Sequence, residues 1–478
     1  MTTAPSLQVC ITRLSNDALQ KLLNKDTLDS TQTFNDIFSL IAHKPWSLLL
    51  DTSGSKQSDG RYNIMAFDPS HIVTAANGKV FLSDNKETVC VPETPFEATR
   101  KYLHSLVEGA TLLSDEDVEH LPFIIGVAGM AGYDTGRFYE SIPSIATNDY
   151  ETPDFAVGLY QYSIIEDTHT GAFYYCSCDG STFPNMITEN HAQTQKSKPF
   201  SLTTPFRSNL SKAQYTACLE SINNYLKAGD CYQVNMAQRF SADFEGDVWR
   251  AYCELRHQNS APFSAFFRTP IGCIASISPE RFLRVKNGNV ETKPIKGTRP
   301  RFTDEAQDKA SAEALLSAQK DRAENLMIVD LLRNDISKHC KAHSVNVPSL
   351  FALESYKAVH HMVSTVVGEL DENTSPLTLL ASAFPGGSIT GAPKIRAMEV
   401  IDELEPHRRN IYCGSVFYMG FREDMDSSIC IRTVLAEHNK LHCWAGGGIV
   451  LDSNADEEYQ ETLDKVSKIV PVLTALGK

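Results

Sequence analysis

The segment SISPERFLRVKNGNVETKPIKGTRPR, residues 276–301, predicts a β-hairpin from its own pattern. Alternating side chains lead up to Asn287-Gly288 and away from it again, and Asn-Gly tolerates the positive φ of a tight turn. The turn is expected to bring Glu280, before the hairpin, and Lys296, after it, to comparable depth on neighbouring strands. An acid and an amine at the same depth in the sheet can act as the proton donor and the nucleophile of a reaction.

Lys296 is flanked by uncharged residues on its own strand, with Arg299 and Arg301 close behind. Burial and neighbouring cations both favour a neutral amine over an ammonium, and a neutral amine is a nucleophile. The same pattern also fits a surface lysine at a strand end, with Glu280 in an unrelated ion pair. This segment alone leaves both interpretations open.

Composition limits the classes of function. The chain has 478 residues, 42% of them hydrophobic and 22% charged, which suffices for two or three globular domains or one large interwoven one. A net charge of −15 argues against a nucleic-acid surface. A small anionic substrate would then need a local positive pocket or a metal ion.

The cysteines and the start of the chain indicate a compartment. The 12 cysteines form no zinc-like pair of CxxC units, and the lone CxC of Cys176 and Cys178 is more typical of a structural pair. The first residues, MTTAPSLQVCITRLSND, lack the basic and apolar regions of a signal peptide, and no apolar run approaches a membrane span. We therefore expect a cytoplasmic protein with reduced thiols.

A polar stretch rich in Asn, Gln, Ser, Thr and Pro divides the chain. Residues 1–180 predict a β-rich N-terminal domain, in which the glycines of FIIGVAGMAGYDTGRF (123–138) favour a closely packed strand rather than a dinucleotide loop. Residues 181–208 predict a linker or surface excursion. Residues 209–478 predict the catalytic domain, with the N- and C-terminal parts of the chain interlaced.

Two predicted helices carry carboxylates three residues apart: Asp321 and Glu324 in the first, Glu458 and Glu461 in the second. Hard oxygen ligands from two helices suit Mg²⁺, which takes one or two carboxylates and keeps positions for water and substrate. The spacing alone is more typical of two solvated helix faces. Each helix also has an apolar stripe that we expect to be buried, namely Leu326, Val329, Leu332 and Ile336 in the first and Tyr459, Leu463, Val466 and Val470 in the second.

Three further elements suit an anion. FPGGSITGAPKIRAMEVIDELEP (384–406) predicts a helix with Thr390 as N-cap, whose N–H groups and positive end favour a carboxylate. SSICIRTVL (427–435) predicts a buried strand with one charge, Arg432, whose guanidinium needs either a substrate carboxylate or a structural acid. The glycines of WAGGGIV (444–450) allow a backbone to approach a ligand closely.

Seven motifs in this order, SISPERF, PIKGTRPR, AENLMIVDLLRND, GSITGAPKIRAM, CIRT, AGGGIV and EEYQETLDK, resemble the chorismate-utilising enzymes. That family includes the large subunits of anthranilate synthase and aminodeoxychorismate synthase, and isochorismate and salicylate synthases. The resemblance implies an α+β fold of two packed antiparallel β-sheets flanked by helices, with a β-rich N-terminal part. It also favours the functional interpretation of the motifs over the structural ones.

Two positions discriminate among the branches of the family. Isochorismate and salicylate synthases carry a water-activating lysine where this chain has Gln233, in QVNMAQR, so attack by water is disfavoured. Anthranilate synthases read PIAGTRPR, whereas this chain has Lys296 in PIKGTRPR, which resembles the aminodeoxychorismate synthase branch. The alternatives are an anthranilate synthase component I and a chorismate- or tryptophan-binding regulatory module without turnover.

The resemblance implies a role for each site residue. Glu280 is the general acid that protonates the departing 4-hydroxyl of chorismate, and Lys296 is the nucleophile that adds at C2. Mg²⁺ is expected on Glu324 and Glu461, with Asp321 and Glu458 nearby or bound through water. The implied substrate-binding residues are Gly297, Thr298 and His361 for the ring carboxylate, Ser388 in a place often held by Thr, and Tyr412, Arg432, Gly446 and Gly448 for the enolpyruvyl carboxylate.

The resemblance also implies partners. No cysteine nucleophile followed by His-x-Glu is found, so ammonia is expected from a separate glutamine amidotransferase subunit in a heterodimer. The product would be 4-amino-4-deoxychorismate, a precursor of p-aminobenzoate and folate. LLLDTSG and GRYNI resemble the tryptophan pocket of the relatives, and Ser53, Arg61 and Tyr62 are the residues expected to line it.

Overall fold

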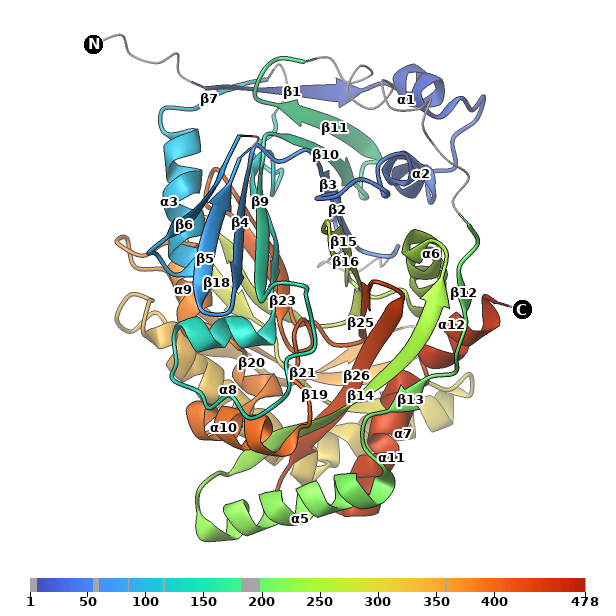
Figure 1. Ribbon diagram of the computed structural model, residues 1–478, viewed down its shortest axis with the longest axis vertical. Coiled ribbons are helices and arrows are strands. Elements are labelled where there is room, and N and C mark those ends of the chain that lie inside the picture. Colours follow the sequence, from blue (N-terminus) through green and yellow to red (C-terminus); the bar gives the residue numbers. More distant parts are fainter. Residues whose placement is uncertain are drawn as a thin grey trace.

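A computed structural model describes residues 7–54, 60–84, 86–114, 117–181, 198–356 and 359–477. Two large β-sheets dominate these residues, with helices on their outer sides (Figure 1). The α+β fold expected from the motifs is therefore confirmed. Within the described residues, the strand pairs are antiparallel except for the parallel pair β1–β7.

The first sheet has 14 strands in the described residues. In spatial order they are β12 (Ser201–Leu202), β14 (Gln233–Glu245), β26 (Lys440–Ile449), β25 (Thr433–Glu437), β16 (Gly272–Ser278), β15 (Phe263–Arg268), β2 (Leu48–Asp51), β3 (Tyr62–Ala66), β10 (Tyr162–Asp167), β11 (Ala172–Ser177), β1 (Gln8–Leu14) and β7 (Thr111–Leu113), with β13 (Arg207–Ser208) and β22 (Gly391–Ala392) paired to β14. The long pair β14–β26, green and red, is plain in Figure 1.

The second sheet has 12 strands in the same described ranges. They follow the order β19 (Ile295–Pro300), β21 (Val359–Glu369), β18 (Asn289–Thr292), β17 (Arg281–Lys286), β24 (Met425–Ser428), β23 (Ser415–Gly420), β8 (Gly126–Ala131), β9 (Phe155–Tyr160), β4 (His71–Ala76), β5 (Lys79–Ser83) and β6 (Thr88–Val91), with β20 (Asn346–Ser355) paired to β21. Strands from before residue 180 and after residue 209 thus enter both sheets.

Helices cover the sheets from several parts of the chain. They are α1 (Asn16–Leu23), α2 (Thr33–Ser39), α3 (Pro95–Val107), α5 (Lys212–Ala228), α6 (Val248–Asn259), α7 (Glu305–Ser317), α8 (Gln319–Ser337), α9 (Pro376–Ala383), α10 (Lys394–Leu404), α11 (Ala455–Val466) and α12 (Val470–Ala475), with the 3₁₀ turns η1 (Tyr133–Phe138) and η3 (Gly387–Ile389). The helix α8 packs on β19 and β21, and α11 packs on β26. α8 and α11 carry the predicted metal carboxylates, and these contacts set where those carboxylates lie.

Both faces of the central strands are buried. Leu48 and Ile64 point into a core shared by the two sheets, whereas their neighbours Leu49 and Met65 join a second core under the helices. Because successive side chains of a strand point to opposite faces, a strand covered on both sides reads as a continuous apolar run. This explains the unbroken LLL and IMA of β2 and β3.

The glycines of β8 confirm the predicted close packing. A Cβ built on Gly126 would lie 2.2 Å from the carbonyl oxygen of Met419, and one built on Gly129 would lie 2.2 Å from that of Ala156. Neighbouring strands therefore leave no room for side chains at these two positions.

The predicted hairpin is present, with Asn287 and Gly288 at φ values of 50° and 74° in the turn between β17 and β18. Lys296 lies further on, in β19, which continues the line of β18 along β21 rather than pairing with β17. If the β17–β18 register is extended, Glu280 falls opposite Ile295, next to Lys296. The expectation of neighbouring strands is wrong, since Glu280 precedes β17 and β19 does not pair with β17; only this extended alignment places the acid and the amine at a common depth.

The chain crosses between the two sheets at two neighbouring points. Pro279 and Glu280 connect β16 of the first sheet to β17 of the second, and residues 429–432 connect β24 of the second sheet to β25 of the first. The crossings are tied together, since the N–H of Ile429 donates to the carbonyl of Glu280 at 3.0 Å and that of Ile277 to the carbonyl of Arg432 at 3.1 Å. The predicted continuous strand over 427–435 is therefore wrong: Arg432 lies in the break, at a φ of 50°.

The proposed boundaries at 180 and 208 remain a prediction, and residues 182–197 of the expected linker lie outside the described residues. All 12 cysteines are free. In the described part of the chain, no helix combines the length and apolar character needed to cross a membrane.

Candidate active site

The crossing between β16 and β17 buries Glu280. Its carboxylate accepts a hydrogen bond from the Ser388 hydroxyl, on η3, at 3.5 Å, and only 8% of the residue is exposed. Burial raises the pKa of Glu280 to about 7, although the nearby Lys296 ammonium, the Ser388 hydroxyl and Lys465 act in the opposite direction. A carboxyl in this state holds a proton that it can give up near neutral pH.

Lys296 lies near two carboxylates. Its positive charge holds down the pKa values of both Glu280 and Glu324, so the amine lies near both groups. The residue is half-buried, and within the described residues its Nζ has no hydrogen bond or ion pair. The structure therefore brings together the acid, the amine and one of the predicted metal ligands.

The predicted metal carboxylates of the two helices face one another. Burial raises the pKa of Glu324, and the nearby Asp321 and Glu461 carboxylates add to the effect, against Lys296 and Lys320. A Cβ built on Gly447 would lie 3.1 Å from Glu458 Oε2 and 3.4 Å from Glu461 Oε1, so these two acids converge on the β26 backbone. Carboxylates crowded in this way raise one another's pKa and favour a cation between them.

Asp321 and Glu458 are already engaged by protein groups. Asp321 forms a 3.0 Å ion pair with Arg299, and Glu458 accepts a 2.7 Å hydrogen bond from Ser453. Within the described residues, no three His, Cys, Asp or Glu side chains are close enough to hold a metal ion as they stand. Two of these carboxylates suffice for Mg²⁺, which fills its remaining positions with water and substrate oxygens.

A buried histidine, His361, and a half-buried arginine, Arg432, lie close to each other. Thr298 and His361 share a 2.8 Å hydrogen bond between Oγ1 and Nδ1. Burial lowers the pKa of His361 to about 4, with Arg432 contributing, so the ring is neutral at physiological pH and close to the guanidinium. Burial also lowers the pKa of Arg432, and within the described residues no hydrogen bond or ion pair reaches its guanidinium.

The remaining predicted residues have tight protein surroundings. A Cβ built on Gly446 would lie 2.3 Å from the carbonyl oxygen of Met236, and one built on Gly448 would lie 2.8 Å from the side-chain nitrogen of Gln233. A side chain at either position would therefore clash with β14. Tyr412 is buried with its ring stacked on Trp444, at 5.9 Å between centroids and an interplanar angle of 5°.

Lys465 is a member of the site for which the sequence motifs predicted no role. Its Nζ lies 2.5 Å from Glu461 Oε1, donates to the carbonyl of Gly446 at 2.7 Å, and is close enough to lower the pKa of Glu280. The four-residue spacing from Glu461 was the available signal, since such pairs face each other on a helix.

Residues 48–471 match the family model for chorismate binding enzymes. The chain belongs to that family. Component 1 of aminodeoxychorismate synthase from Salmonella typhimurium is 44% identical over 91% of this chain and 94% of its own length, and that from Escherichia coli is 44% identical over 91% and 95%. Anthranilate synthase component 1 from Aquifex aeolicus is 32% identical over 94% of both chains.

A solved member of the chorismate-binding enzymes has the same architecture. Anthranilate synthase component I from Streptococcus pneumoniae superposes with a TM-score of 0.74, at 29% identity, over 87% of this chain and 93% of its own. The two packed sheets are thus shared with this relative.

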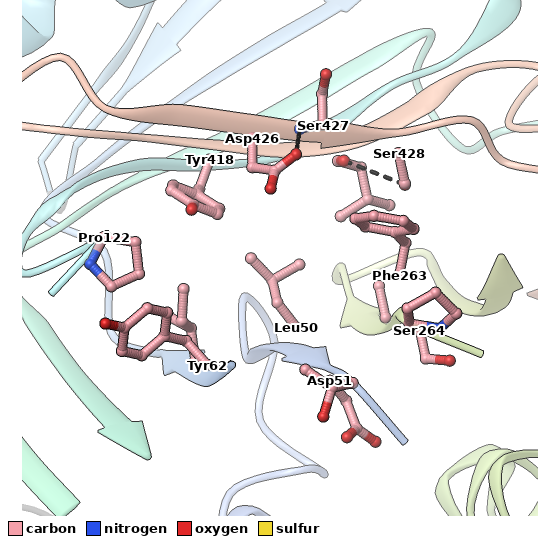
Figure 2. Close-up of a pocket in the computed structure, with 15 residues that line it drawn as sticks. Leu50, Asp51, Tyr62, Pro122, Phe263, Ser264, Tyr418, Asp426, Ser427 and Ser428 are labelled. Atoms are coloured by element: carbon pink, nitrogen blue, oxygen red, sulfur yellow. Dashed lines mark hydrogen bonds between the residues drawn. The ribbon is translucent and has the colours of Figure 1, made fainter. Parts of the chain in front are cut away.

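A separate pocket lies between the sheets, away from Lys296. Its volume is about 90 Å³, with β2, β3 and β15 on one side and β23 and β24 on the other (Figure 2). Of the three residues predicted for a tryptophan pocket, Tyr62 lines it. Ser53 does not line the pocket, but its hydroxyl donates a 2.8 Å hydrogen bond to Ser264, which does. Arg61 forms a 2.8 Å ion pair with Asp167.

Proposed function

We propose that this protein is the large subunit of an aminodeoxychorismate synthase, which converts chorismate and ammonia to 4-amino-4-deoxychorismate. The observation that carries the proposal is the position of Lys296, an unpaired amine close to both Glu280 and Glu324. The identity of 44% with the enterobacterial component 1 proteins supports it. Anthranilate synthase component I is the weaker alternative, because Lys296 stands in PIKGTRPR.

The chemistry follows from the placement of the two groups. Lys296, as the neutral amine, forms a bond to C2 of chorismate while both ring double bonds shift and the C4–O bond breaks. Glu280 gives its proton to the departing 4-hydroxyl, which leaves as water. Ammonia then forms a bond to C4, both double bonds shift back, the C2–N bond to Lys296 breaks, and the Glu280 carboxylate takes up the proton that the new amine releases. The enzyme regains its amine and the product carries nitrogen at C4.

Arg432 is the residue that suits a substrate carboxylate best. A guanidinium buried without a partner is costly, and a planar carboxylate meets its donors in a bidentate fashion. We assign to it the enolpyruvyl carboxylate, with Tyr412 and the Gly446 and Gly448 backbone beside it. Neutral His361, held by Thr298, and Ser388 then position the ring carboxylate and the reacting carbons.

Mg²⁺ fits the opposed carboxylates. Glu324 and Glu461 would hold it, with Glu461 exchanging its ion pair with Lys465 for the ion and Glu458 close by, while Asp321 stays in its ion pair with Arg299. When bound, the ion neutralises the ring carboxylate of chorismate and fixes its orientation. Burial raises the pKa values of Glu324 and Glu458, and the neighbouring carboxylates add to the effect, which supports a cation at this point.

The remaining assignments rest on the same proposal. A separate glutamine amidotransferase subunit supplies ammonia, the product enters p-aminobenzoate and folate synthesis, and the protein works in the cytoplasm. We assign tryptophan to the pocket between the sheets, where the Tyr62 ring and the buried Thr52 hydroxyl, which has no partner among the described residues, suit an amino acid with an aromatic side chain.

Product analysis tests the function. The protein is incubated with chorismate, Mg²⁺ and ammonium chloride, without glutamine, and the products are separated. We expect 4-amino-4-deoxychorismate, with pyruvate released only after a lyase is added. Anthranilate and pyruvate without added lyase would identify an anthranilate synthase, and no turnover with ammonium would favour a regulatory chorismate- or tryptophan-binding module.

A further inference from the structure

We propose that the Arg299–Asp321 ion pair is a clamp that aims Lys296 at its carboxylates, so that both residues position the nucleophile and Asp321 is not a metal ligand. The inference rests on the proposed function, because it assigns the clamp to the lysine chemistry. It concerns β19 and α8, the two elements that carry Lys296 and Glu324.

Lys296 lies in a β-bulge. β18 and β19 pair with β21 in one register from Asn289 to Ile295, which lies opposite Val363. Thr298 then lies opposite His361, so two residues, Lys296 and Gly297, face the single residue Met362. A bulge bends its strand and changes the direction of a side chain. The direction of the Lys296 amine therefore depends on how this one irregularity is held.

Asp321 touches the bulge in two ways. Gly297 has a φ of 80°, and a Cβ built on it would lie 3.1 Å from Asp321 Cγ and 2.8 Å from Leu315 Cδ1. The Asp321 side chain thus packs directly against the bulged backbone. Its Oδ2 also pairs with Arg299 Nη2 at 3.0 Å, while Arg299 Nη1 donates to the carbonyl of Thr298 at 2.9 Å. The strand is therefore fixed to the helix just beyond the bulge.

The clamp links the nucleophile to the metal carboxylate. Asp321 lies three residues before Glu324 on α8, so holding β19 against Asp321 also sets the distance from Lys296 to Glu324. The pair is part-exposed, with 38% of the Arg299 side chain and 21% of the Asp321 side chain accessible. Such pairs contribute little to global stability, so loss of the clamp is expected to show in the reaction and not in unfolding.

Five variants test the clamp: Arg299→Gln, Arg299→Lys, Asp321→Asn, the double variant of Arg299→Gln and Asp321→Asn, and the control Arg301→Gln. The control removes a comparable pair, Arg301–Asp308 at 2.8 Å with 34% and 17% side-chain exposure, two residues further along the chain and outside the bulge. Each protein is mixed with chorismate and Mg²⁺ without ammonia, and formation of the Lys296 adduct is followed by rapid quenching and mass spectrometry. The Mg²⁺ concentration for half-maximal adduct rate is measured alongside.

We expect both single variants to form the adduct about 10- to 100-fold more slowly, since a displacement of about 1 Å costs on that order. The double variant should be no slower than either single variant, because one interaction is lost in all three. Arg299→Lys should recover part of the rate, Arg301→Gln should match the unaltered protein, and the Mg²⁺ requirement should not change.

An Arg299→Gln protein that forms the adduct at the unaltered rate would overturn the clamp. So would an Asp321→Asn protein with a raised Mg²⁺ requirement that Arg299→Gln does not share, because that result would identify Asp321 as a metal ligand. Absence of any Lys296 adduct in the unaltered protein would instead refute the proposed function, and the clamp with it. Thermal unfolding of each variant separates loss of fold from loss of positioning.

Discussion

At the scale of single residues, the protonation state of Glu280 leads to the first prediction. Its pKa of about 7 lies above the ordinary value, so the carboxyl is protonated below about pH 7 and loses its proton above it. Because the reaction also needs Lys296 as the neutral amine, we expect the rate of Lys296 adduct formation to decline at about pH 7 relative to its trend at lower pH. Ammonia is left out of this assay, because its own titration would obscure the profile.

Glu280→Gln provides the matching control. The amide retains the shape of the carboxyl but cannot give up a proton to the leaving hydroxyl, so the adduct rate should fall by about 10² to 10⁴-fold. The remaining rate should lose its decline above pH 7. A decline that persists in Glu280→Gln would assign it to another group.

Arg432 yields a prediction that separates binding from stability. Arg432→Met removes a half-buried charge that has no partner among the described residues, so the melting temperature should stay the same or rise. Loss of a charged hydrogen bond of about 1.5–3 kcal/mol should raise the KM for chorismate by roughly 10- to 150-fold. A lower melting temperature with unchanged KM would indicate a structural arginine.

Candidate site residues could be named from the sequence more readily than their contacts or the strand order. Glu280, Lys296 and Glu324 were named from motifs, and the structure brings them together because two sheet crossings and one bulge converge. Their surroundings could not be predicted. The partner of Asp321 and the proximity of Lys465 depend on where α8 and α11 pack, and a linear pattern does not contain that information.

At the scale of elements, the glycine run of β26 offers a matched pair of variants. In Gly447→Ala the new methyl group would press on Glu458 and Glu461, so we expect a raised Mg²⁺ requirement with the fold retained. In Gly446→Ala the methyl group would meet the Met236 carbonyl at 2.3 Å, so the β14–β26 pair should weaken and the melting temperature fall. Mg²⁺ titration of activity and thermal unfolding measure the two effects, and equal behaviour of the variants would contradict this assignment.

Element boundaries were predictable where local chemistry determines them. The Asn287-Gly288 turn is correct because both residues tolerate positive φ. Thr390 was wrong as an N-cap: α10 begins after Pro393, and the residues before it pair with β14. Leu326 was wrong as a buried residue, since it is 46% exposed while Asn325 is buried, because the face of α8 is set by its contacts with β19 and β21.

At the scale of the whole molecule, the two parts of the chain share both sheets. β15 of the second part pairs with β2 of the first, and β23 pairs with β8. A fragment of residues 209–478 would expose these strand edges and half of the common core. We therefore expect it to be insoluble or to lack a cooperative thermal transition, whereas the full chain unfolds in a single transition. A soluble fragment with its own sharp transition would show that the second part folds independently.

This arrangement also explains why the sequence predicted the layers and not their strand order. Alternating and apolar runs indicate strands, but β2 lies beside β15 across more than 200 positions, and no local pattern encodes such pairs. The two packed sheets were reached through the family resemblance, and the order of their strands comes from the structure.

The central claim is that Lys296 attacks chorismate. Mass spectrometry of the protein after incubation with chorismate and Mg²⁺, without ammonia, tests it most directly. We predict a gain of one chorismate less one water on the peptide that contains Lys296, discharged by ammonium and absent in Lys296→Ala. A Lys296→Ala protein that still forms an adduct, or that still turns over chorismate with ammonium at the unaltered rate, would contradict the account.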